Sequence, residues 1–236
     1  MALLTLEAIS KHYRQGEIDV PALKQVDLSV EPGEFAALVG PSGSGKTTLL
    51  NIIGGLDVPN QGHVWLHGTD LTRLKDAQLS DFRLFQLGFI FQAYNLVPVL
   101  SALENVELIM VLQGRPSTDR EARAKHYLAL VGLEDVMLRR PSALSGGQQQ
   151  RVAVARALAA GPRLVLADEP TANLDSENAT ALLDIMHRLC REEQTTFIFS
   201  THDPRVMERA ERIITLRDGA IVQDQRLNQT AYADQN

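Results

Sequence analysis

A glycine-rich loop between an apolar strand and a helix constrains this chain of 236 residues more than any other feature. The continuous apolar run from Phe35 to Val39 predicts a strand that is buried on both faces. A helix is expected from about Lys46 to Ile53, because Gly54 follows and ends it. The loop matches the pattern G-x-x-x-x-G-K-[ST] and consists of Gly40, Pro41, Ser42, Gly43, Ser44, Gly45, Lys46 and Thr47, with Thr48 as a further contact.

The chemistry of this loop points to a bound nucleotide. Glycines allow backbone N–H groups to turn toward a phosphate, and the helix N-terminus adds about half a positive charge. Lys46 is expected to reach the β- and γ-phosphates, and the hydroxyl of Thr47 can bind Mg²⁺. An accidental match has a chance of about one in a hundred in a chain of this length. We therefore predict a site for a nucleotide with Mg²⁺.

Two acidic residues at the end of a second apolar strand fit the same site. Residues 164–167 predict a buried strand, and Asp168 and Glu169 follow it directly. Ligands of α/β sheets bind at the carboxyl ends of the strands, where such residues lie. Asp168 is expected to hold Mg²⁺, directly or through water, and Glu169 to polarise the attacking water. The alternative is a solvated strand end before a turn at Pro170.

Strands alternate with helices along the chain, which predicts an α/β fold: a P-loop NTPase core with a mainly parallel sheet. An antiparallel β region is expected near the N-terminus, and an α-helical subdomain is inserted at residues 93–157. The α/β core then comprises residues 1–92 and 158–224, and residues 225–236 form a polar tail. The other expected strands cover residues 4–9, 26–30, 63–66, 196–200 and 213–216, and Asp218-Gly219 turns the last of them into a hairpin.

Three capping boxes predict where helices of the inserted segment begin. In each, a hydroxyl at the helix start is followed three residues later by a Glu or Gln that can bond back to it. These pairs are Ser101 with Glu104, Thr118 with Glu121, and Ser145 with Gln148. The corresponding helices are expected to end near Gly114, near Gly132 and at about residue 160.

Charge and composition exclude several classes of protein. The chain has 23 basic and 29 acidic residues, so we expect no nucleic-acid partner, which would need a clustered excess of Lys and Arg. Its single cysteine, Cys190, can form neither an internal disulfide nor a cysteine-based zinc site. No apolar run approaches the roughly 20 residues that span a bilayer, and the N-terminus lacks the features of a signal peptide. We expect a cytosolic protein that can dock on a membrane partner.

The segment Leu144-Ser145-Gly146-Gly147-Gln148 resembles the signature sequence of ATP-binding cassette (ABC) ATPases, and the resemblance covers nearly the whole chain. Two glycines in a first helical turn weaken a helix, so ordinary capping does not explain them. The resemblance implies that this segment completes the ATP site of an opposite subunit. Two copies of the chain would then pair head to tail with two ATPs between them.

Further positions match the family in order, and the resemblance implies a role for each. Tyr13 would stack on adenine, and Gln92 would touch Mg²⁺ or water and lead toward a membrane partner. Asp175, in the segment Asn173-Leu174-Asp175, would cross the dimer interface. His202 would contact the γ-phosphate.

Other segments resemble a narrower group, the cassettes of lipoprotein-releasing and macrolide-exporting systems. They are residues 54–57, residues 88–92 with Asn95, Leu96 and Pro98, residues 104–106, residues 144–151 and residues 167–176. Ala172 departs from the group, which carries glycine there. The resemblance implies a permease with four transmembrane helices and a large extracytoplasmic domain. The chain would then lie on the cytoplasmic face of the inner or plasma membrane.

Apolar residues near Gln92 are candidates for the surface that receives the permease. Tyr94, Leu96, Val97 and Leu100 could form a groove for a short permease helix, or could belong to the core of the subdomain.

Three other functions remain open: the ATPase of a solute importer, a regulator of cell-wall hydrolases, and a soluble ABC ATPase that acts on nucleic acid or ribosomes.

Overall fold

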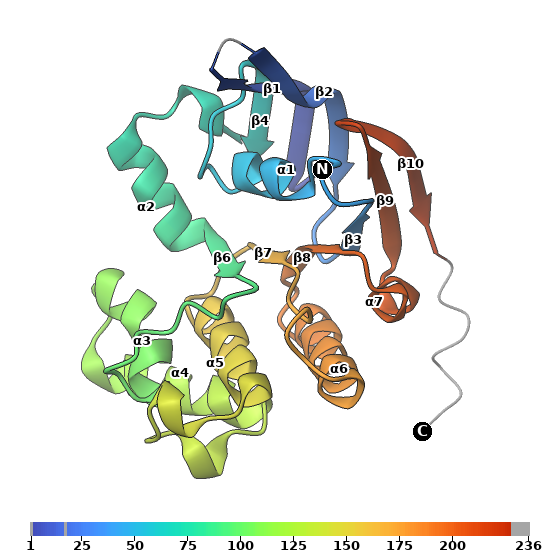
Figure 1. Ribbon diagram of the computed structural model, residues 1–236. Coiled ribbons are helices and arrows are strands. Elements are labelled where there is room, and N and C mark those ends of the chain that lie inside the picture. The colour runs from blue at the N-terminus through green and yellow to red at the C-terminus, as the bar shows by residue number, and fades with distance from the viewer. Residues whose placement is uncertain (1, 17, 228–236) are drawn as a thin grey trace. The chain divides into compact units, whose positions relative to one another are not determined.

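The computed structural model describes residues 2–16 and 18–227 of the chain (Figure 1). Most of the polar tail predicted from residue 225 therefore lies outside the described residues. The chain divides into two compact units, Met1–Arg73 with Ile198–Asn236, and Leu74–Phe197. The chain passes from the second unit to the first within strand β8 (Thr196–Thr201), all of whose residues are buried.

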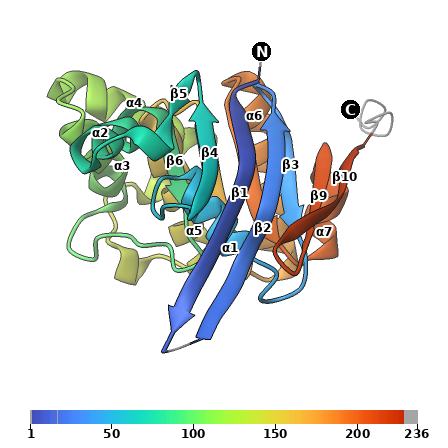
Figure 2. The ribbon, with the colours of Figure 1, turned by 90° about the horizontal axis from the view of Figure 1, so that it is seen from above.

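The first unit contains the antiparallel β region that the sequence predicts near the N-terminus. Its strand order is β2-β1-β4-β5, and Figure 2 shows the long ribbon of β1 and β2 beside β4. Leu4 of β1 faces Val30 of β2 on one side and Leu66 of β4 on the other. The strands are β1 (Leu4–Gln15), β2 (Ile18–Val30), β4 (Gln61–Leu66) and β5 (Thr69–Asp70), and the 3₁₀ turn η1 (Leu71–Arg73) follows them.

The first unit also holds the strand that leads into the glycine-rich loop. Strand β3 (Phe35–Val39) is buried along its whole length, as a strand covered on both faces must be. It runs parallel to β9 (Arg212–Arg217), and β10 (Ala220–Arg226) returns antiparallel to β9 after the predicted Asp218-Gly219 turn. Helices α1 (Lys46–Ile53) and α7 (Pro204–Arg209) complete the unit.

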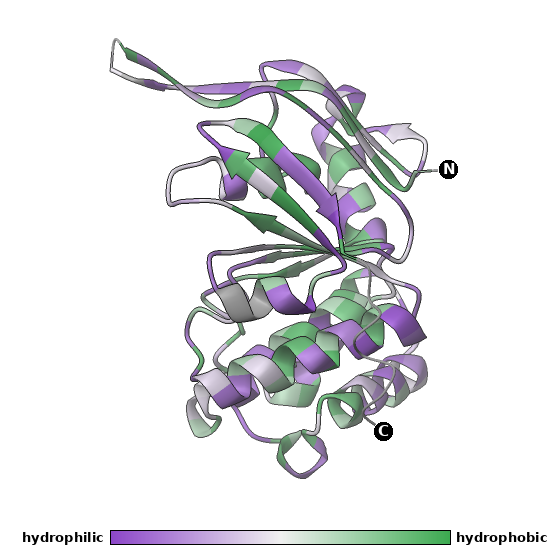
Figure 3. Cartoon of the chain, turned by 90° about the vertical axis from the view of Figure 1, so that its right-hand side faces the viewer, coloured by the Kyte–Doolittle hydropathy of each residue, from purple (hydrophilic) through white to green (hydrophobic). Residues whose placement is uncertain are grey.

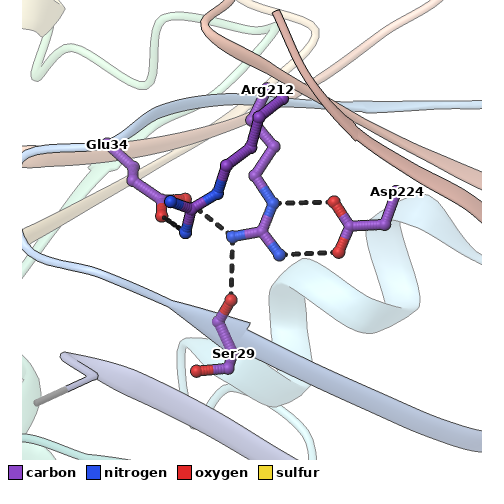
Figure 4. Close-up of polar contacts among 5 residues, drawn as sticks. Ser29, Glu34, Arg212 and Asp224 are labelled. Atoms are coloured by element: carbon purple, nitrogen blue, oxygen red, sulfur yellow. Dashed lines mark hydrogen bonds and ion pairs between the residues drawn. The ribbon is translucent and has the colours of Figure 1, made fainter.

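A nearly buried arginine ties the strands of the first unit together (Figure 4). Arg212 on β9 donates to both carboxylate oxygens of Asp224 on β10, at 2.7 and 2.6 Å, and to Glu34 at 2.7 Å. It also donates to the carbonyl oxygen of Ser29 on β2, while Arg226 donates to Glu34. The hydrogen bonds to Asp224, followed by those to Glu34, raise the pKa of Arg212 although burial opposes its charge. These bonds join β2, β9, β10 and the start of β3.

The second unit is mainly helical. Helices α3, α4 and α5 pack on one another (Figure 1), and the hydropathy colouring shows hydrophobic and hydrophilic segments along the helices (Figure 3). Strands β6 and β7 pair in parallel. The elements are α2 (Asp76–Gln86), β6 (Leu87–Ile90), α3 (Ala102–Leu112), α4 (Ser117–Leu130), η2 (Glu134–Val136), η3 (Pro141–Ala143), α5 (Gly146–Ala159), β7 (Leu164–Asp168) and α6 (Ser176–Glu192).

Two of the three predicted capping boxes are confirmed. Ser101 caps α3 and Ser145 caps α5, each in a reciprocal bond with the residue three positions later. The third prediction is wrong, because α4 begins at Ser117 after Pro116 and has no side-chain cap. Pro116 has an extended ψ of 148° and sets the boundary, so Thr118 is already inside the helix. Glu121 instead pairs with Lys125 one turn later, at 2.6 Å.

Among the described residues, no helix combines the length and the apolar character that crossing a bilayer requires. The single cysteine, Cys190, lies fully buried on α6.

Candidate functional site

The glycine-rich loop is shaped by backbone contacts that leave no room for side chains at two positions. A Cβ atom on Gly40 would overlap the carbonyl oxygen of Leu216 on β9 and lie 2.7 Å from Oγ of Ser44. A Cβ atom on Gly45 would lie 2.6 Å from the carbonyl oxygen of Ala22 on β2. Gly45 is also the N-cap of α1 with a φ of 105°, where any side chain would be strained. Only glycine fits these two positions.

Two polar side chains of the loop fit a phosphate. Lys46 Nζ donates to the carbonyl oxygens of Gly40 and Pro41, at 2.8 and 3.1 Å, so the ammonium group is held over its own loop. The hydroxyl of Ser44 is buried and has no hydrogen-bond partner among the described residues. A buried hydroxyl without a partner costs free energy, and a phosphate oxygen in the loop would supply the missing partner. The loop therefore has the shape, the charge and an unpaired hydroxyl group for an anion.

The turn between β9 and β10 holds the glycine-rich loop through backbone hydrogen bonds. Gly219 N–H donates to the carbonyl oxygen of Ser44 at 3.1 Å, and Lys24 N–H on β2 donates to Gly219 in turn at 2.8 Å. A Cβ atom on Gly219 would lie 2.7 Å from the carbonyl oxygen of Ala22. The Asp218-Gly219 turn thus holds the glycine-rich loop against β2, a role that the sequence pattern alone does not predict.

Two more predicted site residues belong to the first unit. Tyr13 lies on β1, is 39% exposed, and donates its hydroxyl hydrogen bond to Asp57 at 2.6 Å. His202 is exposed and directly follows β8, where the hydroxyl oxygen of Thr201 accepts the N–H of Asp203 at 3.0 Å. The first unit therefore carries the glycine-rich loop, the predicted stacking tyrosine and the predicted γ-phosphate histidine.

In the second unit, two parallel strands bring the predicted acidic and amide groups to the same edge. Ile90 at the end of β6 pairs with Ala167 of β7, so Gln92 and the pair Asp168 and Glu169 follow at the same carboxyl edge. Glu169 has a φ of 49°, a left-handed conformation that costs a non-glycine residue roughly 1–2 kcal/mol. Backbone strain of this kind is typical of functional positions.

The predicted signature residues form the N-terminus of α5. Ser145 Oγ accepts the N–H of Gln148 at 3.2 Å, and Gln148 Oε1 accepts the N–H of Ser145 at 3.0 Å. A Cβ atom on Gly146 would lie 2.9 Å from the hydroxyl oxygen of Tyr94, and one on Gly147 would lie 3.2 Å from Asn178 Oδ1. The two glycines therefore allow two other segments to approach the helix start closely.

Side-chain hydrogen bonds hold these segments together. Buried Arg156 on α5 donates to the carbonyl oxygens of Asn95 and Tyr94, at 2.5 and 3.0 Å, and both of these residues have a positive φ. Asn173 Nδ2 donates to the carbonyl oxygen of Gln92 at 2.9 Å. We call residues 92–95, 145–148 and 173–178, together with Arg156, the signature cluster.

Asp175 lies in the signature cluster as the N-cap of α6. Its carboxylate accepts the backbone N–H of Asn178 at 2.9 Å and the side-chain amide of the same residue at 2.8 Å. These bonds, the backbone bond first, lower the pKa of Asp175. The carboxylate therefore carries its charge at neutral pH, at a helix N-terminus that favours a negative group.

Sequence reasoning missed Arg156, Asn178 and Asp57 as residues that hold the site. A signal existed for Arg156, because a lone cation in the apolar run of residues 152–159 must find buried acceptors. Asn178 also had a local signal, because it lies three residues after Asp175 and donates both its backbone and its side-chain N–H to that carboxylate. The side chains that bind Asp57 lie on the distant strand β1, so no local pattern marks Asp57.

Comparison with known proteins gives a consistent result. The family model described as ABC transporter matches residues 23–172. The lipoprotein-releasing system ATP-binding protein LolD of Anaeromyxobacter dehalogenans is 49% identical over 220 residues, covering 93% of this chain and 92% of that protein. The macrolide export ATP-binding/permease protein MacB of Syntrophobacter fumaroxidans is 48% identical over 223 residues, covering 94% of this chain and 31% of that protein.

A solved structure supports the same fold. The ATP-binding cassette MJ0796 of Methanocaldococcus jannaschii, in a dimeric post-hydrolysis state bound to ADP and Pi, superimposes with a TM-score of 0.88. It is 42% identical, and the match covers 95% of this chain and 99% of that chain.

Proposed function

Because the chain belongs to the ABC transporter family, we propose that it hydrolyses ATP in a head-to-tail dimer and powers a membrane permease of the lipoprotein-releasing or macrolide-exporting type. The observation that carries this proposal is the glycine-rich loop, with its two sterically required glycines, its unpaired buried hydroxyl and its ammonium group. Relatives with LolD and MacB names, at 49% and 48% identity, support the choice of group.

Residues of the loop and of the sheet edge would hold the phosphates and the metal ion. The backbone of residues 40–45 and the ammonium of Lys46 would bind the β- and γ-phosphates, with Thr48 beside them. Tyr13 of the same unit would stack on adenine. Thr47, Gln92 and Asp168 have hydroxyl, amide and carboxylate oxygens, the ligands that Mg²⁺ prefers. Mg²⁺ at this place would neutralise part of the charge that the phosphate oxygens carry.

Glu169 and His202 would act on the reacting groups. Glu169, in its strained position after β7, would accept a hydrogen bond from the attacking water and polarise it. His202 would donate a hydrogen bond to the γ-phosphate, whose charge is spread over its oxygens as the bond to the leaving group breaks.

The signature cluster would complete the ATP site of a second copy. The N-terminus of α5, with its Ser145 hydroxyl and the N–H groups of Gly146 and Gly147, is a second anion site without a phosphate loop of its own. We propose that it binds the γ-phosphate of an ATP held by the glycine-rich loop of the partner subunit, with Asp175 at the interface. ATP would then join the two copies, and hydrolysis would remove that link.

The permease would dock on the inserted helical subdomain, residues 93–157, next to the loop after Gln92. Of the four residues predicted to form a groove there, all are half-buried, and Asn105 fixes the loop by bonds to Val97 and Leu100. Two other apolar residues are more exposed, Val99 at 69% and Leu138 at 80%, on adjoining segments that bond through the N–H of Ala102 and the carbonyl of Arg139. We propose that the docking surface includes both.

The permease would have four transmembrane helices and a large extracytoplasmic domain, and the chain would lie peripherally on the cytoplasmic face of the membrane. Recovery of partners with tagged Glu169→Gln protein from solubilised native membranes in MgATP, read by mass spectrometry, tests this. A many-helix permease with a solute-binding protein would instead indicate an importer. Soluble or ribosomal partners alone would contradict the transporter assignment.

The Glu169→Gln variant also tests the chemistry. It should bind ATP normally but hydrolyse it at least about 100-fold more slowly, because the amide cannot polarise the water as a carboxylate does. The accumulating ATP-bound dimer should be visible by size-exclusion chromatography with light scattering. Unchanged turnover would show that Glu169 does not polarise the water. The Lys46→Ala variant should differ from Glu169→Gln, because it should weaken the binding of ATP itself.

A further inference from the structure

Asp57, which follows α1, accepts hydrogen bonds from two side chains. One is Tyr13, which the proposed function places against the base, and the other is Lys11. Tyr13 donates its hydroxyl hydrogen bond to Asp57 Oδ2 at 2.6 Å, and Lys11 Nζ donates to Asp57 Oδ1 at 2.6 Å. The backbone N–H of Val58 donates to the same Oδ1 at 2.7 Å, and Lys11 also donates to the carbonyl oxygen of Val58 at 2.8 Å. The carboxylate therefore has a partner for each oxygen.

These bonds fix the orientation of the tyrosine ring. The hydroxyl is anchored at one end, and Lys11 Nζ lies over the ring, 4.9 Å from its centroid, within the range of a cation–π contact. The lysine side chain is only 11% exposed, whereas Tyr13 as a whole is 39% exposed. One face of the ring is thus covered by a cation, and the exposed part of the ring is left for a ligand.

The strand that carries Tyr13 needs such an anchor. The pairing of β1 with β2 shifts register on both sides of Lys11, so ladder bonds alone define this stretch less firmly than a regular pair would. The loop that follows α1 supplies further bonds, because Asn60 Oδ1 accepts the N–H of His12 at 2.9 Å and Asn60 N–H donates to the carbonyl of Ser10 at 2.8 Å.

Asp57 is also coupled to the phosphate loop through a single short helix. Helix α1 begins at Lys46 in the loop, and the N–H groups of Leu56 and Asp57 both donate to the carbonyl oxygen of Asn51 in that helix, at 2.8 and 3.2 Å. The path from the loop through α1 to Asp57 and on to Tyr13 is made of regular backbone and hydrogen bonds. Such a path sets the ring at a defined position relative to the phosphates.

The charge state supports an anchor that works at neutral pH. Burial opposes the charge of Asp57, but the bonds from Lys11, Tyr13 and Val58 outweigh it and lower the pKa of the carboxyl group. Burial and the bond to Asp57 raise the pKa of the Tyr13 phenol. The carboxylate is therefore ionised, and the phenol keeps the proton that it donates.

We propose that Asp57 is a positioning residue for the nucleobase: it orients the ring of Tyr13, with Lys11 on one face, so that the base stacks on the other. This inference rests on the proposed function, in which Tyr13 stacks on adenine. It adds that base recognition, and not phosphate binding, depends on a carboxylate that never touches the nucleotide. A purely structural Asp57 would instead support all ligands of the loop alike.

The test compares a ligand that has a base with one that lacks it. Dissociation constants of MgATP and of magnesium tripolyphosphate are measured by calorimetry for the wild type, Asp57→Ala, Asp57→Asn, Tyr13→Phe and Tyr13→Ala. Asp57→Ala should weaken ATP binding about tenfold, as expected for a charge-assisted hydrogen bond, and leave tripolyphosphate binding unchanged. The KM for ATP should rise with little change in kcat. Asp57→Asn keeps one acceptor oxygen, so its dissociation constant for ATP should lie between those of the wild type and Asp57→Ala.

A second aspartate gives a matched control. Asp27 Oδ1 accepts the N–H of Ala8 at 2.8 Å and thus also holds β1, but far along the strand from Tyr13. Asp27→Ala should change neither dissociation constant. Tyr13→Phe should also weaken ATP binding, and the double variant should weaken it by less than the two single effects combined, because the bond between Tyr13 and Asp57 is missing from both single variants.

The outcomes separate the inference from its premise. If Tyr13→Ala leaves the ratio of the two dissociation constants unchanged, the stacking role of Tyr13 is wrong and the role of Asp57 falls with it. If Tyr13→Ala changes this ratio and Asp57→Ala does not, stacking stands and positioning by Asp57 is wrong. Equal weakening of both ligands by Asp57→Ala would make Asp57 a structural residue only and would overturn the proposal.

Discussion

The glycine-rich loop of the first unit and the signature cluster of the second both lie at helix N-termini, where we propose that they bind phosphate, but they are built differently. The loop takes its shape from the absence of side chains, since Gly40 and Gly45 lie against backbone carbonyl oxygens. The cluster takes its shape from side chains that bind backbone, namely Ser145, Arg156 and Asn173.

The difference shows how each site can fail. A loop made by close backbone approach is broken by adding atoms, because the surrounding carbonyl groups cannot move without disturbing β2 and β9. A cluster held by side-chain donors is broken by removing atoms, because the carbonyl oxygens that they bind are then left without partners. The following variants test this contrast, from the largest expected effect to the smallest.

Adding one methyl group to the loop should have the largest effect. Gly40→Ala places a Cβ atom on the carbonyl oxygen of Leu216, so ATP binding should weaken at least about 100-fold or the unit should not fold. Gly43→Ala is the matched control, because its Cβ atom meets nothing within 4 Å and only its φ of 78° is unfavourable. It should weaken binding about fivefold. Equal effects by calorimetry would contradict the steric account.

Removing a guanidinium from the cluster should come next. Arg156→Ala leaves the carbonyl oxygens of Tyr94 and Asn95 without their donor, and should lower the free energy of unfolding by about 3 kcal/mol. Arg156→Lys retains the charge but not the planar fork, so it should recover only part of the loss. Denaturation in urea measures both variants. An Arg156→Ala protein as stable as the wild type would show that these two bonds do not hold the cluster.

Two serine caps allow function to be separated from stability. Ser101 on α3 and Ser145 on α5 form the same capping box, so Ser→Ala at either should cost about 1 kcal/mol of stability. Only Ser145→Ala should also slow ATP hydrolysis, because only this hydroxyl would meet the γ-phosphate of the partner's ATP. Equal turnover in the two variants would contradict the role of Ser145 in the ATP site.

The stability of the two capping boxes should respond differently to acid, and this is the smallest of the expected effects. The pKa of Glu104 is lowered, first by the N–H of Ser101, which its carboxylate accepts. Its contribution to stability is therefore complete above the ordinary Glu pKa of about 4.3 and is lost as the pH falls through the lower folded value. Glu104→Gln should remove this acid dependence, and Gln148→Glu should add one at α5. Thermal unfolding of the two variants, measured between pH 3 and pH 7 at about every half pH unit, tests both expectations.

The sequence predicts features that short segments encode. The loop at residues 40–47 and the caps at Ser101 and Ser145 were predictable, because each needs only a few neighbouring residues of defined type. The cap at Thr118 was not, since Pro116 outweighs a hydroxyl two residues later. Helix α2 escapes prediction because none of its residues is buried, so it carries no apolar stripe.

Contacts between distant segments lie beyond such prediction. Tyr13 and Asp57 are 44 residues apart, and Arg156 and Tyr94 are 62 apart, so no local pattern links them. Resemblance to a family supplies the roles of single residues, but not the groups that hold those residues in place. The residues of the candidate site could therefore be proposed from the sequence, while the contacts that support them required the structure.

The most direct test of the account asks whether the loop of one copy and the signature cluster of the other form one ATP site. Lys46→Ala would break the loop, and Ser145→Arg would block the cluster at an exposed position. Each variant alone should be inactive. A mixed dimer, purified through two different tags, retains one intact site in the head-to-tail arrangement and should regain up to about half of the wild-type ATPase activity. A mixed dimer as inactive as its parents would contradict the account.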